Sequence, residues 1–128
     1  MSVSPPILSQ ETKIALQVYQ GKNITWEMPV VNIQDDTAVD ITGAAIIFSV
    51  KERVADSPAL FTRIVGTGIV IDPDQVTNKG KYQLSLIPGN TEDLEPQLYQ
   101  CDVELTLNSK EQTIARGTLE VLDVVTGL

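Results

Sequence analysis

The residues best equipped for chemistry are Asp72, Asp74 and Asn78, whose side-chain oxygens fall within one short stretch of the chain. Carboxylate and amide oxygens are the ligands that calcium takes in proteins. The stretch lacks the regular spacing and the closing glutamate of an EF-hand loop, and Asp and Asn are also favoured at the corners of turns. We therefore interpret it as a solvated turn and predict no metal site.

Catalysis would need reactive side chains that this chain mostly lacks. It contains no histidine and one cysteine, Cys101. Without histidine there is no usual general base at neutral pH and neither a Ser-His nor a Cys-His nucleophile pair. A lone cysteine forms neither a disulfide within the chain nor a cysteine-cluster zinc site, so we interpret Cys101 as a small core residue. We expect a protein that is not an enzyme, with no catalytic and no cofactor-binding residues.

The charge balance bears on the class of partner. Seventeen acidic residues against nine basic residues give a formal net charge of −8. This charge repels phosphate backbones and anionic lipid surfaces, so we expect neither nucleic acid nor a membrane as a partner. No apolar run approaches the ~18 residues of a membrane span, and residues 1–6 lack the basic start of a secretory signal, which predicts a cytoplasmic site of synthesis.

The elements that must position any site are short runs of alternating apolar and polar residues. In one of them Tyr99, Cys101 and Val103 share a face, which is the period of a half-buried strand. No segment sustains a period of 3.6 over three turns, so we predict under about a tenth of helix. The pattern predicts an all-β fold, specifically an immunoglobulin-like antiparallel β-sandwich of seven to eight strands. The predicted strands cover residues 12–19, 24–33, 44–51, 59–64, 68–71, 81–87, 98–107 and 112–125.

Three connections carry more detailed predictions. Gly66-Thr67-Gly68 indicates a hairpin between the two runs that flank it. Residues 91–96 predict one helical or 3₁₀ turn. Gly117 lies inside a predicted strand and therefore indicates a bulge.

Two aromatic residues have informative positions. Tyr99 follows a tight turn and stands two residues before Cys101. In immunoglobulin-like sandwiches a tyrosine placed in this way bonds back to upstream backbone and pins the crossing between the sheets. We interpret Tyr99 as such a structural corner, bonded between residues 92 and 95, with an ordinary core residue as the alternative. The single tryptophan, Trp26, fits either the core or an interface anchor, and the burial tendency of aromatic residues favours the core.

Several turn-plus-strand segments follow one another in a distinctive order. They cover residues 20–26 (QGKNITW), 40–44 (DITGA), 48–51 (FSVK), 80–84 (GKYQL), 99–103 (YQCDV) and 117–121 (GTLEV). In this order the chain resembles, from about residue 18 to residue 126, the N-terminal domain of phage baseplate upper proteins and short proteins encoded among phage structural genes. The resemblance implies a role in building a virion through docking to other phage structural proteins. It implies no catalytic residues.

The first residues of the chain differ from the rest. Residues 1–11 have no apolar period and contain Pro5 and Pro6, which predicts an extended N-terminal arm ahead of a β-sandwich domain of residues 12–128. Val3, Ile7 and Leu8 are apolar contacts that such an arm offers, and the prolines lower the entropy lost when it docks. We expect these five residues to form an interface with a neighbouring subunit. The alternative is that the arm adds an edge strand to its own domain.

Taken together, these features predict a structural virion protein of a tailed bacteriophage. We expect it to be made in the host cytoplasm, to reside in the virion as a homo-oligomer, and to dock to tail, baseplate, neck or head proteins during assembly. The alternative is a carbohydrate- or receptor-binding β-sandwich, which requires exposed aromatic rings for stacking on sugars. The chain has six aromatic residues, and most of them fall on predicted inward faces, which favours the structural role.

Overall fold

The structure is a computed structural model that describes residues 12–32, 35–52 and 58–124. The predicted arm, with Val3, Pro5, Pro6, Ile7 and Leu8, lies outside the described residues. Strands make up 62% and helix 4% of the described residues, so the predicted all-β class and low helix content are confirmed. Within the described ranges, no helix has the length and apolar composition needed to cross a membrane.

The described residues form ten strands and one helical turn. The alternating pattern locates most of the strands correctly, but the predicted run 24–33 is interrupted after Pro29. The helical turn begins at Pro88 rather than at residue 91, because a proline suits a first helical position. The elements are β1 (Thr12–Tyr19), β2 (Ile24–Pro29), β3 (Val31–Asn32), β4 (Thr37–Ala38), β5 (Ala45–Lys51), β6 (Ala59–Val65), β7 (Gly68–Ile71), β8 (Lys81–Leu86), α1 (Pro88–Thr91), β9 (Leu98–Leu107) and β10 (Lys110–Leu122).

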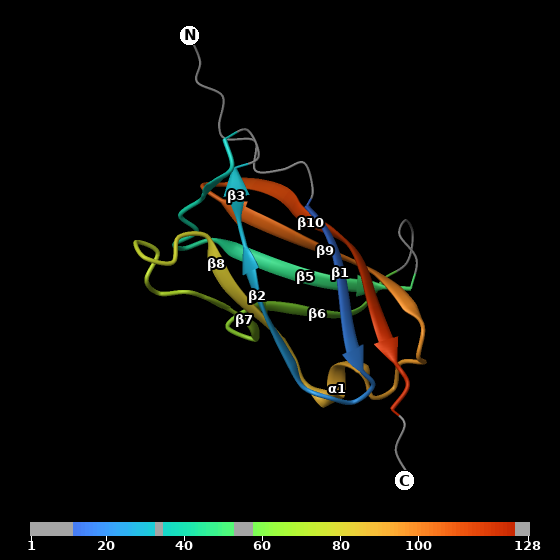
Figure 1. Ribbon diagram of the computed structural model, residues 1–128. Coiled ribbons are helices and arrows are strands. Elements are labelled where there is room, and N and C mark those ends of the chain that lie inside the picture. The colour runs from blue at the N-terminus through green and yellow to red at the C-terminus, as the bar shows by residue number, and fades with distance from the viewer. Residues whose placement is uncertain (1–11, 33–34, 53–57, 125–128) are drawn as a thin grey trace.

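Eight strands belong to one hydrogen-bonded sheet in the order β1-β10-β9-β5-β6-β7-β8-β2, and β3 and β4 form a separate ribbon. Two neighbours, β1 with β10 and β6 with β7, are parallel, so the prediction of a purely antiparallel arrangement is wrong at these two places. The sheet is barrel-like, and in Figure 1 β2 and β8 cross in front of β5 and β6. Because β1 and β10 run in parallel, residue 12 and residue 122 lie at opposite ends of the molecule.

The connection between β6 and β7 is not the predicted hairpin. Ile64 pairs with Gly68 in parallel, and the Ile64 N–H donates to the Thr67 carbonyl at 3.0 Å. Gly66 and Gly68 have φ of 92° and 99°, and a Cβ added at Gly68 would overlap the Arg63 guanidinium. Thr67 returns a hydrogen bond to the Ile64 carbonyl, so the chain reverses for this one pair. The glycines then direct it along β8 instead of continuing an antiparallel ladder with β6.

The core lies inside the curled sheet and is built by alternation along the strands. Phe48, Leu84 and Leu105 are fully buried, and Cys101 is buried among them, as predicted for a small core residue. Burial raises the pKa of Cys101 to about 12. Trp26 is half-buried and packs against this core.

Gly117 serves a different purpose from the predicted bulge. The register of β10 against β9 shifts between Thr113 and Ala115, so the bulge lies there. Gly117 faces Ile14 of β1, and an added Cβ would collide with the Ile14 backbone. The missing side chain is what lets β1 approach β10 closely enough to pair.

Candidate interaction surface

The loop from α1 to β9 makes a tight corner around Tyr99. Tyr99 is 3% exposed, and its hydroxyl donates a hydrogen bond of 2.7 Å to the Glu95 carbonyl. The acceptor lies within the predicted backbone range, residues 92–95. It ties the start of β9 to the loop that precedes it.

The corner is also fastened to the turn between β1 and β2. The buried Thr91 hydroxyl accepts a hydrogen bond of 2.9 Å from the Gly21 N–H, and the Gln20 side-chain amide donates one of 2.6 Å to the Leu94 carbonyl. Sequence reasoning missed these contacts because they join residues about seventy positions apart. Loop backbone that is fixed at both ends forms a rigid wall for any surface beside it.

A shallow groove of about 290 Å³ lies against this corner. Glu52 at the end of β5 and Leu60 of β6 line one side, and residues 93–95 of the loop with Gln97 and Tyr99 line the other. Burial raises the pKa of Tyr99, and the charges of Glu95 and Glu52 raise it further. The groove therefore combines two apolar side chains, Leu60 and Leu94, with three carboxylates, and no basic residue lines it within the described chain.

Strand β6 presents an open edge beside the groove. Its residues pair with β5, but β7 pairs with it only from Ile64 onward. Ile64 directs its N–H and its carbonyl to Thr67, away from β5, so the alternation of an antiparallel ladder directs the N–H and carbonyl of Thr62 to the same open side. The register shift between β5 and β6 leaves Leu60 without a partner on β5.

The outward side chains of β6 are apolar or neutral. Leu60 is 43% exposed and Ile64 is 45% exposed, and Thr62 stands between them. Ile64 pairs across the ladder with Ile47 of β5, which is 40% exposed. Exposed apolar residues that are contiguous on a strand mark a contact surface more strongly than scattered ones.

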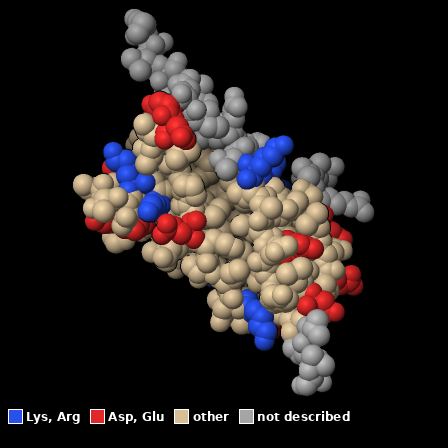
Figure 2. All heavy atoms as spheres, in the orientation of Figure 1, with Lys and Arg blue, Asp and Glu red and all other residues tan. Residues whose placement is uncertain are grey.

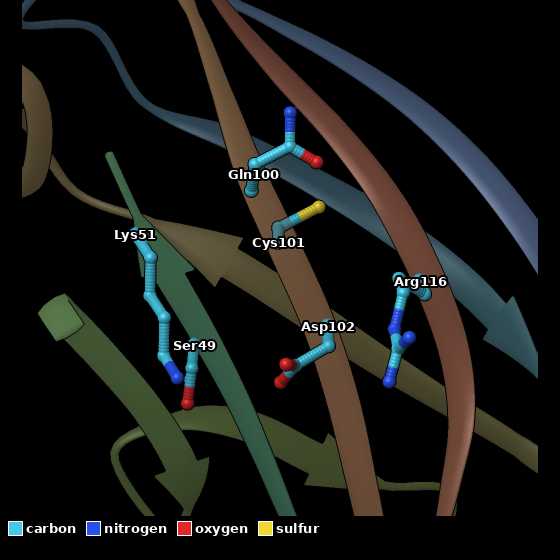
Figure 3. A pocket seen from close by; sticks show the side chains of 6 residues that line it. All are labelled: Ser49, Lys51, Gln100, Cys101, Asp102 and Arg116. Atoms are coloured by element: carbon cyan, nitrogen blue, oxygen red, sulfur yellow. The ribbon is translucent and has the colours of Figure 1, made fainter. Parts of the chain in front are cut away.

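The outer face of β5, β9 and β10 is polar instead. Ser49, Asp102 and Arg116 stand in one row across the three strands, and Lys51 lies along the same face. Figure 3 shows the Asp102 carboxylate between Arg116 on one side and Ser49 and Lys51 on the other. Further along β9, burial raises the pKa of Glu104, and the nearby charges of Asp102 and Glu111 raise it further. The middle of this face carries charges of both signs, and its exposed apolar residues, Ile47 of β5 and Leu98 at the start of β9, stand apart from one another.

The predicted turn at residues 72–80 uses its carboxylates on its own backbone. Asp72 accepts a hydrogen bond of 2.8 Å from the Asp74 N–H, and Asp74 accepts one of 3.0 Å from the Thr77 N–H. These oxygens stabilise the turn, in agreement with the interpretation as a turn.

Sequence reasoning missed Gln75 in the same turn. Its buried Oε1 accepts hydrogen bonds from Ile41 N–H and Gly80 N–H, and its Nε2 donates to the Asp72 carbonyl. A glutamine between two turn residues carries no local sign of burial, because its partners at Ile41 and Gly80 become neighbours only in the fold.

The exposed surface offers few aromatic rings. Of the six aromatic residues, which all lie in the described ranges, only Tyr19 is mostly exposed, at 55%. Figure 2 shows charges of both signs mainly around the margin of one face, with uncharged residues in its middle. This arrangement does not favour a sugar-stacking platform.

No protein-family model matches the sequence, and no curated protein matches it.

Proposed function

We propose that this protein is a non-catalytic interaction module that docks to other proteins of an assembly through the open edge of β6. The observation that carries the proposal is the combination at that edge of the outward-directed N–H and carbonyl of Thr62, which pair with no other strand of the described chain, with exposed Leu60 and Ile64. Open edges of this kind are templates for a strand from another chain.

We infer an immunoglobulin-like sandwich as the scaffold. If the sheet is divided at the bend between β6 and β7, it gives the groups β1-β10-β9-β5-β6 and β7-β8-β2. In immunoglobulin-like domains strands C, F and G share one sheet, and strands B, D and E share the other. The two groups correspond if β5, β9 and β10 are matched to C, F and G, and β2, β7 and β8 to B, D and E. The Tyr99 hydrogen bond at the start of β9 supports the same inference, since a tyrosine corner occupies that position in the family.

The assembly that we propose is the particle of a tailed bacteriophage. Support comes from the order of segments shared with phage baseplate upper proteins, including residues 80–84 and 99–103. The geometry is compatible with a spacer between neighbours, because β1 begins at the opposite end of the molecule from the end of β10.

The test is to purify phage particles from the organism that encodes this protein and to search for the protein in them by mass spectrometry. Particles in which this protein carries a label are then imaged. We expect a fixed copy number per particle and label at one location. A protein found only in the soluble fraction of lysed cells, with none in the particles, would falsify the virion role.

A further inference from the structure

The edge of β6 differs from the open edge of β2 in its lack of protection. Natural sheets protect exposed edges with charged side chains or prolines. The outward residues of β6 that precede its bend are Leu60 and Thr62, and its one charged residue, Arg63, is 8% exposed and donates through Nε to the Ser85 carbonyl at 2.9 Å. An edge that is left unprotected is expected to be covered when the protein works.

The room along this edge limits what can pair with it. Ile64 already uses its outward N–H and carbonyl on Thr67, so an added strand can bond only before that residue, at Thr62 and toward Leu60. A strand that continues past Leu60 reaches the groove at the Tyr99 corner. A side chain of this strand therefore meets the three carboxylates of Glu52, Asp93 and Glu95.

We propose that the occupant is an extended segment of a partner protein that adds to β6 as a strand and places a lysine or arginine in this acidic groove. The inference rests on the proposed docking function and names the chemistry of its partner. Charge complementarity selects the occupant, because a cation meets three carboxylates that no basic residue offsets in the described lining.

A second copy of this chain fits the edge less well. Each copy carries its own acidic groove and a net charge of −8, and neither copy offers the other a basic residue in the described lining of the groove. Like charges brought together at an interface disfavour it. A basic segment gains attraction from the same groups.

The test uses fluorescein-labelled eight-residue peptides of alternating threonine and valine. In each peptide one residue, whose side chain is meant to enter the groove, is lysine, arginine, glutamine or glutamate. Binding is measured by fluorescence anisotropy in low salt. We expect the lysine and arginine peptides to bind about tenfold more tightly than the glutamate peptide, since several carboxylates act on one cation. Raising the salt should remove the difference, because exposed charges are screened.

Variants of the protein separate the two parts of the proposal. The triple variant Glu52→Gln, Asp93→Asn, Glu95→Gln should erase the preference for basic peptides, whereas a matched variant on the outer face, Glu104→Gln, Glu111→Gln, Glu120→Gln, should keep it. Thr62→Pro removes the outward N–H on an edge where proline is tolerated, and it should weaken all peptides. Leu60→Lys puts a cation into the groove and should weaken the basic peptides most, so the proposal stays testable if Thr62→Pro fails to fold.

Three results would overturn the proposal: equal binding of the lysine and glutamate peptides, no effect of the β6 variants, or a dimer in sedimentation that Thr62→Pro dissociates. The last result would assign the edge to a second copy. These outcomes are distinct from failure of the virion role, because peptide binding is measured on the isolated chain and particle content is measured on the virion.

Discussion

Strand β2 has one open edge, on the side away from β8. The Val30 N–H points toward β8, to the Gly80 carbonyl, and backbone N–H groups alternate in direction along a strand, so the positions with an outward N–H are Thr25, Glu27 and Pro29. Pro29 has no N–H, and Glu27 is charged and lies 3.7 Å from Lys81 Nζ. At the open edge of β6, the N–H and carbonyl of Thr62 face outward, and no charged side chain of the described part of this strand accompanies them. The difference teaches that burial alone does not identify the docking edge, because both edges are exposed and only one carries the features that repel an added strand.

The largest effect is expected at the bend that ends the free part of β6. Gly68→Ala adds a Cβ where the Arg63 guanidinium lies, at a φ of 99°, so the guanidinium must move away and lose its hydrogen bond to the Ser85 carbonyl. We expect a loss of about 4 kcal/mol in the free energy of unfolding, from backbone strain and the lost hydrogen bond together. Gly66→Ala is the matched control, because its φ is 92° but nothing lies within 4 Å of the new Cβ. Equal losses in chemical denaturation of the two variants would show that Arg63 does not hold the bend.

The next effect concerns the support of the β2 edge. Gln75→Leu leaves the N–H groups of Ile41 and Gly80 without their acceptor, which should cost about 3 kcal/mol in unfolding free energy. The same change at the exposed Gln83 of β8 should stay within about 0.5 kcal/mol. If both variants unfold at the same denaturant concentration, the buried amide does not hold the turn beside β2.

A smaller effect is expected at the corner beside the β6 groove. Tyr99→Phe removes the hydroxyl that bonds the Glu95 carbonyl, and we expect a loss of about 1 to 2 kcal/mol in unfolding free energy. Tyr19→Phe, at an exposed tyrosine, is the control and should leave the melting temperature unchanged. A Tyr99→Phe variant with the melting temperature of the parent would show that this hydrogen bond does not stabilise the corner.

The smallest effect is a pH dependence in the turn at residues 72–80. Hydrogen bonds from the Thr77 backbone, then from its side chain and the Val76 N–H, hold the pKa of Asp74 below its usual value of 3.8. Since the folded pKa is the lower one, Asp74 contributes stability above that usual value and loses it as the pH falls through the folded pKa. Asp74→Asn should therefore show a flatter fall of melting temperature below about pH 4 than the parent. Parallel curves would contradict this assignment.

Local alternation was enough to locate most strands, because one face of each strand is buried and the period of two is visible without tertiary information. The corner at Tyr99 was also predictable, since its hydrogen bond spans four residues. The bend at Gly68, the parallel pairing of β6 with β7 and the clamp by Gln75 were not, because each depends on residues such as Arg63 or Ile41 that come close only in the fold. The open edge was missed for the same reason: edges are a property of strand order, and strand order is not written in any single segment.

Hydrogen exchange tests the contrast between the two edges most directly. The measurement compares deuterium uptake in residues 59–63 and 24–29, once in the isolated chain and once in the purified assembly that contains it. We predict that residues 59–63 gain protection in the assembly, at Thr62 above all, while residues 24–29 exchange at the same rate in both states. Protection gained at residues 24–29 with none at 59–63 would contradict the assignment of β6 as the docking edge.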